Sequence, residues 1–202
     1  MQPYPIPAQP VEVSEEIKKS RFITLLEPTP GVEAAKAFVQ LIKSRHPAAR
    51  HHCWAFVAGP PNDSQQLGFS DDGEPAGTAG KPILGQLMGS GIGEITAVVV
   101  RYYGGIKLGT GGLVRAYGNG VQLALASLPI KQKVPQAEFL LQCDYGQITM
   151  IETLLQQVGG SILQSEYGAA VDIRLSLPAY EAAEIVNRLY NLSRGSLLLQ
   201  PV

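Results

Sequence analysis

A strand that runs through a glycine-rich turn into a helix constrains this chain most. The segment from Val98 to Gly112 reads VVVRYYGGIKLGTGG, and its three valines predict a buried strand. A cation and two aromatic rings end that strand, and two glycine pairs follow around Lys107 before a helix expected over 112–128. Backbone N–H groups at a helix start, beside cations, favour an anionic ligand such as a phosphate or a nucleic-acid backbone.

The residues of this junction form the first candidate site. We expect ligand or nucleic-acid contact from Arg101, Tyr102, Tyr103, Gly104, Gly105, Lys107, Gly109, Thr110, Gly111, Gly112 and Arg115. The spacing is neither that of a P-loop nor that of the dinucleotide fingerprint, which would need glycine in place of Val114. An equally open interpretation is structural, since glycines permit positive φ and close helix–strand packing.

The distribution of glycine predicts two domains. Sixteen of the 22 glycines fall between Gly59 and Gly120, and the rest of the chain is more regular. We place an N-terminal domain at 1–130 with a Pro-rich extended arm at 1–10, a linker at 131–135 between prolines, and a C-terminal domain at 136–202. Both halves mix strands and helices, so the fold class is α+β.

Periodicity assigns the elements of each half. In the N-terminal half we expect strands at 11–13, 21–26, 52–57 and 95–103, and helices at 32–42, 78–88 and 112–128. In the C-terminal half we expect strands at 138–143, 161–165, 171–177 and 196–200, with helices at 148–158 and 182–189. The second order, β-α-β-β-α-β, is the ferredoxin-like arrangement.

A second candidate site is the turn GFSDDGEPAGTAGKP at 68–82, with Asp71, Asp72, Glu74 and Lys81. Clustered carboxylates suit a Mg²⁺ or Ca²⁺ loop or another ligand contact, although the spacing is not that of an EF-hand. General acid–base catalysis is a further reading. The structural reading is that these carboxylates cap backbone N–H groups and pair with Lys81 or Arg101.

Other polar residues complete the candidates. A His-His-Cys run at 51–53 resembles zinc ligands, but neighbours on a strand face opposite ways, so we assign no metal and no cofactor. We expect accessory basic contacts from Lys18, Lys19, Arg21, Arg50 and His51. Residues 1–133 carry 13 Lys and Arg against 10 Asp and Glu, and the remainder carries 3 against 7, which weakly favours the N-terminal half for a polyanion.

Composition restricts the broad class. The chain is 45% hydrophobic and 16% charged, as in ordinary globular proteins, and its two cysteines lie far apart. No apolar run approaches the ~18 residues of a membrane span, and the N-terminus lacks the pattern of a signal peptide. We therefore expect a cytoplasmic protein without a membrane partner.

Long mixed motifs resemble one family. The segments FSDDGEPAGTAGKP at 69–82 and VRYYGGIKLG at 100–109 are similar to the two hallmark segments of the IMPACT family, most closely its bacterial branch, and EEIKKSRFI, HPAARHHCWAFVAG and SRGSL extend the likeness over nearly the whole chain. The resemblance implies an N-terminal two-layer β-α-β domain like domain IV of elongation factor G. It also implies a C-terminal domain like the last domain of that factor. Eukaryotic members are regulators of translation that compete for an activator of the kinase of initiation factor 2.

Three hypotheses of function remain open at this stage. The first is a non-catalytic, translation-associated regulator that binds RNA or the ribosome through the basic and aromatic surface of the N-terminal domain. The second is a protein-interaction module with a translation-related partner. The third is an enzyme acting on a phosphorylated or nucleotide substrate, with the turn at 109–112 as its phosphate loop.

Overall fold

The computed structural model describes residues 1–202, and the chain divides into two compact units. One unit spans Tyr4–Gln132, and the other comprises Lys133–Val202 together with Met1–Pro3. Both mix helices and strands, so the chain is a two-domain α+β protein. None of its helices combines the length and apolar character needed to cross a membrane.

A five-stranded antiparallel sheet forms the centre of the N-terminal unit. Its strands lie in the order β2-β3-β6-β4-β5. Their bounds are β2 Val11–Ile17, β3 Ser20–Pro28, β4 His51–Val57, β5 Leu67–Ser70 and β6 Ile95–Tyr102. The short β5, which follows a 3₁₀ turn at Ser64–Gln66, had no periodic signal and was not expected.

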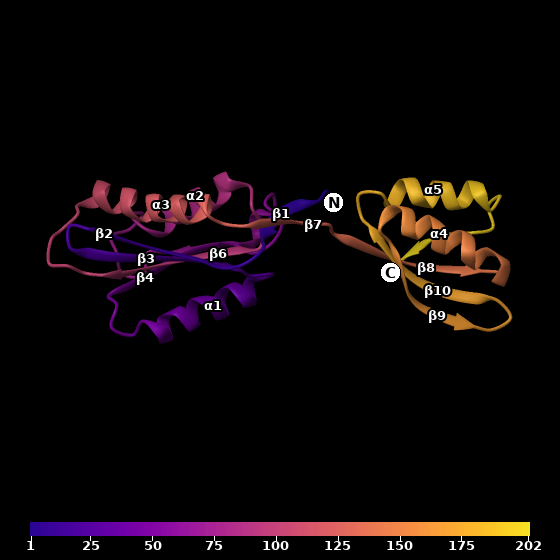
Figure 1. The fold of residues 1–202 in the computed structure, drawn as a ribbon, viewed down its shortest axis with the longest axis horizontal. Helices are drawn as coiled ribbons and strands as arrows, with labels where there is room; N and C mark the ends of the chain where they lie inside the picture. Colours follow the sequence, from indigo (N-terminus) through magenta and orange to yellow (C-terminus); the bar gives the residue numbers. More distant parts are fainter. The chain divides into compact units, whose positions relative to one another are not determined.

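Helices cover both faces of this sheet (Figure 1). Helix α1 (Val32–Arg45) packs on one face, whereas α2 (Gly80–Ser90) and α3 (Thr110–Ala126) pack on the other. The unit therefore has three layers, which corrects the two-layer expectation. The physical reason is visible in β6: Val98 and Val100 pack with α1, and Val99 packs with α2 and α3, so neither face of the strand is left to solvent.

Part of the expected extended arm at 1–10 is a paired strand. Strand β1 (Tyr4–Pro7) forms a two-stranded sheet with β7 (Ile130–Lys133), in the places where we expected an arm and a linker. The side chain of Tyr4 is buried, and its hydroxyl donates to Glu94 Oε1 at 3.0 Å. This pairing fixes both ends of the N-terminal unit.

The C-terminal unit has the expected β-α-β-β-α-β order. Its antiparallel sheet has the strand order β11-β8-β10-β9. The elements are β8 Gln136–Cys143, α4 Ile148–Val158, β9 Ser161–Tyr167, β10 Val171–Pro178, α5 Ala182–Leu192 and β11 Gln200–Pro201, with a 3₁₀ turn at Tyr145–Gln147. The last strand is much shorter than the expected 196–200.

Only one face of this second sheet is covered by helices (Figure 1). Phe139, Leu141 and Cys143 of β8 join the core beneath α4 and α5, and the alternate residues Leu140 and Gln142 are exposed. The strict alternation seen in the sequence is the consequence of this one-sided burial.

Candidate functional site

The end of strand β6 sends its side chains to opposite faces. Tyr102 turns toward the α1 side, where its hydroxyl lies 2.8 Å from His46 Nδ1. Tyr103 is 44% exposed, so it is the ring available to a ligand. The turn that follows requires glycine at position 104, because a Cβ there would lie 2.0 Å from the backbone of Lys19.

Arg101 is buried, contrary to our expectation of a surface cation. Its side chain is only 6% exposed, and Nη1 donates to Glu74 Oε1 at 2.6 Å. The guanidinium also lies over the rings of Phe22 and Tyr103, with its Cζ atom 5.5 and 5.4 Å from the ring centroids. Its Nε is buried without a hydrogen-bond partner. Arg101 therefore holds Glu74 and Tyr103 in place and is not free to bind a polyanion alone.

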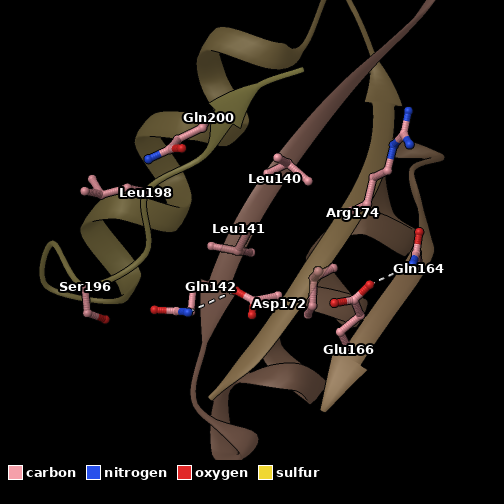
Figure 2. Close-up of a pocket in the computed structure, with 11 residues that line it drawn as sticks. Leu140, Leu141, Gln142, Gln164, Glu166, Asp172, Arg174, Ser196, Leu198 and Gln200 are labelled. Carbon is pink, nitrogen blue, oxygen red and sulfur yellow. Dashed lines mark hydrogen bonds between the residues drawn. The ribbon is translucent and has the colours of Figure 1, made fainter. Parts of the chain in front are cut away.

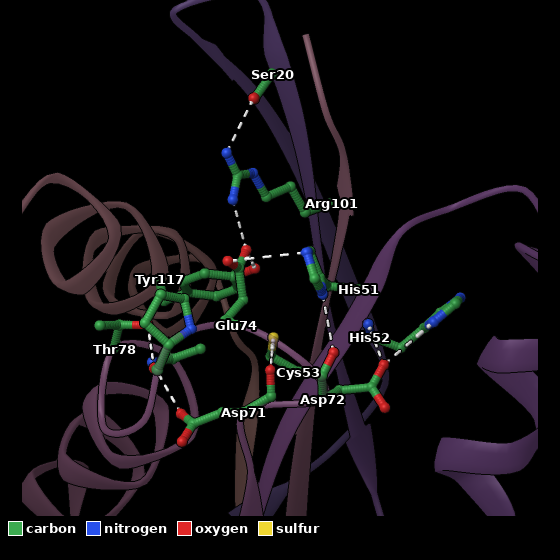
Figure 3. A network of polar contacts seen from close by, with 12 residues as sticks. Ser20, His51, His52, Cys53, Asp71, Asp72, Glu74, Thr78, Arg101 and Tyr117 are labelled. Carbon is green, nitrogen blue, oxygen red and sulfur yellow. Dashed lines mark hydrogen bonds and ion pairs between the residues drawn. The ribbon is translucent and has the colours of Figure 1, made fainter. Parts of the chain in front are cut away.

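Glu74 is the centre of the buried polar network (Figure 3). Its Oε1 accepts a second hydrogen bond, from the Tyr117 hydroxyl of α3, at 2.6 Å. Burial raises the pKa of the Tyr117 phenol, so the hydroxyl stays protonated and donates. The other carboxylate oxygen, Oε2, faces His51 Nε2 at 3.8 Å.

Asp71 stabilises the backbone of its own turn. Its carboxylate accepts hydrogen bonds from the N–H groups of Gly77, Ala79 and Gly80 at 2.8–3.1 Å, where helix α2 begins. Burial alone would raise the pKa of Asp71, but these hydrogen bonds outweigh it and hold the pKa below its usual value. The structural reading of this carboxylate, as a cap, is the one that its contacts support.

Asp72 fixes the same turn to the sheet and to α1. Its carboxylate accepts from the backbone N–H of His52 at 2.7 Å and from Lys43 Nζ at 2.9 Å. Burial of Asp72 opposes its ionisation. The hydrogen bond and charge of Lys43, together with the hydrogen bond from the His52 N–H, outweigh burial and lower the pKa of Asp72. Asp72 has φ 42°, a left-handed conformation that the adjoining contacts maintain.

Around this network lies a pocket of about 420 Å³. It is lined by Arg50, His51, Glu74, Pro75, Arg101, Tyr103, Lys107, Leu108, Gly109, Thr110 and Leu113. Three cationic side chains and one carboxylate give this lining a formal excess of two positive charges, the histidine not counted. Lys107 and Arg50 are exposed and take part in no ion pair, so their charges are available to a ligand.

The two helices that begin beside the network differ at their N-termini. The start of α2 is occupied by the Asp71 carboxylate, whereas no side chain caps the start of α3 at Gly109. The first N–H groups of a helix carry partial positive charge and need acceptors. The pocket lined by Gly109 and Thr110 therefore presents uncapped donors next to Lys107.

Only part of the expected site converges on this pocket. The other expected residues do not line it: Tyr102, Gly104, Gly105, Gly111, Gly112, Arg115, Asp71, Asp72, Lys81, Lys18, Lys19 and Arg21. Lys18 and Lys19 form the tight turn between β2 and β3, both at positive φ. Lys81 acts on Asp71 through its charge, and Arg115 is exposed on α3.

Sequence reasoning missed several residues of the site. Leu108, Leu113 and Pro75 supply its apolar walls, and Ser20 and Tyr117 belong to the polar network. A signal existed for Tyr117, since a tyrosine in a buried helical stripe needs a partner for its hydroxyl.

The His-Cys run does not gather into a metal site. Cys53 Sγ donates to the Asp71 carbonyl at 2.9 Å, and burial raises the pKa of its thiol. His52 Nε2 lies 2.8 Å from the His46 carbonyl, away from His51. No group of three or more His, Cys, Asp or Glu side chains is arranged to hold a metal ion.

Comparison with known proteins identifies the family. Residues 18–125 match the Impact N-terminal domain, and residues 141–196 match a domain of unknown function, DUF1949. The chain is 65% identical to IMPACT family member YigZ of Escherichia coli over 98% of each protein. It is 54% identical to an IMPACT family member of Haemophilus influenzae over 99% of this chain and 97% of that one.

More distant and structural relatives agree. IMPACT family member YvyE of Bacillus subtilis is 35% identical over 89% of this chain and 82% of that protein. A crystal structure described as that of a hypothetical protein is 64% identical and superposes with a TM-score of 0.75, covering 100% of this chain and 98% of that one. The chain belongs to the IMPACT family.

Proposed function

We propose that the pocket of the N-terminal unit binds a phosphate group of RNA, and that the protein is a non-catalytic, cytoplasmic regulator associated with translation. The observation that carries the proposal is the uncapped start of α3, which opens on a pocket with two unpaired cations, Lys107 and Arg50. Anions bind at such helix termini because backbone N–H groups and the helix dipole both favour negative charge.

The exposed ring of Tyr103 favours RNA over a free inorganic anion. The ring lies on the pocket rim with the Arg101 guanidinium on it, so a base can stack against a ring already held in position. Aromatic stacking beside a cationic groove is the usual way proteins hold single-stranded nucleic acid. The proposed likeness of this unit to domain IV of elongation factor G agrees with a role at the ribosome.

Salt dependence of RNA binding tests this proposal. Fluorescence anisotropy with a single-stranded RNA should give a log K that falls linearly with log salt concentration. Lys107→Ala and Arg50→Ala should each weaken binding and reduce the slope by about 0.7, as expected for one lost phosphate contact on a single strand. Lys36→Ala, on α1 across the sheet, is the matched control for charge and should change neither quantity.

An unchanged slope in Lys107→Ala and Arg50→Ala would refute the mapping to this pocket. Absence of RNA binding at low salt would refute the proposal itself. Arg101→Ala is unsuitable for this test, because loss of a buried charge would disturb the fold.

A separate observation favours the protein-interaction alternative. The open face of the C-terminal sheet forms a hollow of about 650 Å³, and Figure 2 shows the side chains around it. Leu140 and Leu198 are exposed there beside the paired side chains of Gln142 and Asp172. Co-purification of a stoichiometric partner protein that resists nuclease and is lost with Leu140→Asp would support this alternative.

A further inference from the structure

His51 and Glu74, which both line the N-terminal pocket, face each other in the polar network (Figure 3). The side chains of His51 and Glu74 are 13% and 4% exposed, and His51 Nε2 lies 3.8 Å from Glu74 Oε2. This distance is too long for a hydrogen bond between them. Glu74 Oε1 already accepts two hydrogens, so Oε2 is the carboxylate oxygen left for a ligand.

The tautomer of the neutral His51 ring follows from its second contact. Its Nδ1 lies 2.8 Å from the backbone carbonyl oxygen of Asp72, which can only accept. In the neutral ring Nδ1 therefore carries the hydrogen, and Nε2 has a lone pair. Two lone pairs then meet across the gap, and a ligand that donates two hydrogens would satisfy both.

The position of the gap selects which donors fit. The phosphate donors of the pocket are Lys107 and the start of α3, and the stacking ring, Tyr103, is exposed on the rim. With phosphate and base so assigned, the hydroxyls of the sugar between them are the donors left to pair with the two buried atoms. A ribose with both hydroxyls free donates one hydrogen to each acceptor.

We propose that the pocket binds the 3′-terminal nucleotide of RNA, with the 2′- and 3′-hydroxyls donating to Glu74 Oε2 and His51 Nε2. The proposal rests on the function proposed above and adds chemical selectivity to it. DNA lacks the 2′-hydroxyl, and an internal ribonucleotide has its 3′-oxygen esterified, so only an RNA 3′ end offers both donors. A base amino group also carries two hydrogens, and the experiment separates it from the diol.

The test uses 5′-labelled hexaribonucleotides that differ only in their last sugar: ribose, 2′-deoxyribose, 3′-deoxyribose or 2′,3′-dideoxyribose. We expect the dideoxy end to bind about tenfold or more weakly, because each lost hydrogen bond leaves a recessed acceptor unpaired, and the single-deoxy ends to lie between. Oligomers that end in uridine and in adenosine should bind alike, since both carry the diol.

The outcomes separate the two proposals. Equal affinity for all four ends would leave RNA binding in place and overturn the 3′-end proposal. Strong binding of an adenosine deoxy end together with loss of the uridine ribose end would assign the gap to a base amino group, and would also overturn it. Absence of binding for every oligomer would refute both proposals.

A variant assigns the selectivity to the gap. His51→Ala removes one acceptor without leaving a buried charge, and it should reduce the ribose preference toward unity while the salt slope of RNA binding stays the same. His46→Ala is the matched histidine control, because His46 contacts Tyr102 outside the pocket and should keep the preference. Full preference in His51→Ala would contradict the assignment.

Discussion

The two sheets of this protein differ in whether their polar side chains are buried or exposed. The N-terminal sheet is covered on both faces, and its polar side chains meet in a buried network around Glu74. The C-terminal sheet leaves one face open, where Arg174 and Glu138 form a pair that is 45% and 41% exposed. Burial fixes the orientation of the first set, whereas the second set remains free to exchange partners with water.

The difference shows why the larger hollow is the weaker candidate for a small ligand. The C-terminal hollow is about 650 Å³, against about 420 Å³ for the N-terminal pocket. Its polar groups, among them Gln142, Asp172, Gln164 and Glu166, already bond in pairs along the sheet. The smaller pocket instead combines unpaired cations, an uncapped helix start and two facing acceptors. Convergence of unsatisfied groups is therefore more informative than volume.

The largest expected effect comes from breaking the buried ion pair. Arg101→Met should lower the free energy of unfolding of the N-terminal unit by about 3–5 kcal/mol, because Glu74 would remain as a buried charge without its cation. Trp54, the single tryptophan, lies on β4 of this unit, so its fluorescence during urea denaturation reports the change.

A double-variant cycle sharpens that result. Glu74→Gln combined with Arg101→Met leaves no unpaired charge, so it should cost less than the sum of the two single changes. If the losses in the free energy of unfolding were additive, the two side chains would not depend on each other. The buried network would then not be a difference between the two sheets.

Much of the fold was predictable because it rests on local periodicity. The C-terminal unit was predicted from the alternation in β8 and β10 and from the helical spacing in α4 and α5. Each of these elements buries one side only, so its apolar residues recur at the period of the strand or helix. Strand β6 of the N-terminal sheet lacks this alternation because both of its faces are buried. The two layers expected for this unit came from the family resemblance, and the structure has three.

The site was predictable in composition but not in geometry. The residues of the junction around Lys107 were identified from their types, and five of those expected there line the pocket: Arg101, Tyr103, Lys107, Gly109 and Thr110. That Arg101 is buried depends on Glu74, 27 residues away in the sequence, and on Tyr117. The convergence of Arg50 and His51 on the same pocket depends on the pairing of β4 with β6. Such long-range contacts do not affect the local periodicity of the sequence, so periodicity does not predict them.

Two glycines of the junction give the next effect. Gly104→Ala should destabilise the N-terminal unit by roughly 2–3 kcal/mol, because the new Cβ would meet the Lys19 backbone at 2.0 Å and one of the two segments must move. Gly111→Ala is the matched control in the first turn of α3, where a Cβ meets nothing within 4 Å. It should be neutral or stabilise by about 0.5 kcal/mol.

Urea denaturation followed by Trp54 fluorescence measures the stability of both variants and tests whether the two glycines have the same structural role. Equal stability of Gly104→Ala and Gly111→Ala would remove the close-packing role that we assign to position 104.

Acid should affect the N-terminal unit through the Asp71 cap. The pKa of Asp71 is lower in the folded chain than in the unfolded chain, so its charge adds stability above the unfolded value of about 3.9. That contribution is lost as the pH falls through the lower folded value. Asp71→Asn should therefore cost about 1–2 kcal/mol at neutral pH, and its stability should approach that of the wild type on acidification. Trp54 fluorescence in urea between pH 7 and pH 2 measures both curves, and parallel curves would contradict the assignment.

The smallest expected effect tests the other side of the comparison. Arg174 donates from Nε to Glu138 Oε2 at 2.8 Å on the open face, with the geometry of a good ion pair. Because both side chains are almost half exposed, water replaces much of what the pair gains, and Arg174→Ala should cost less than about 1 kcal/mol. Hydrogen exchange of β8 and β10 measures the C-terminal unit in the full chain. A loss as large as that of Arg101→Met would show that exposure does not separate the two pairs, and that the open face is held together as firmly as the buried network.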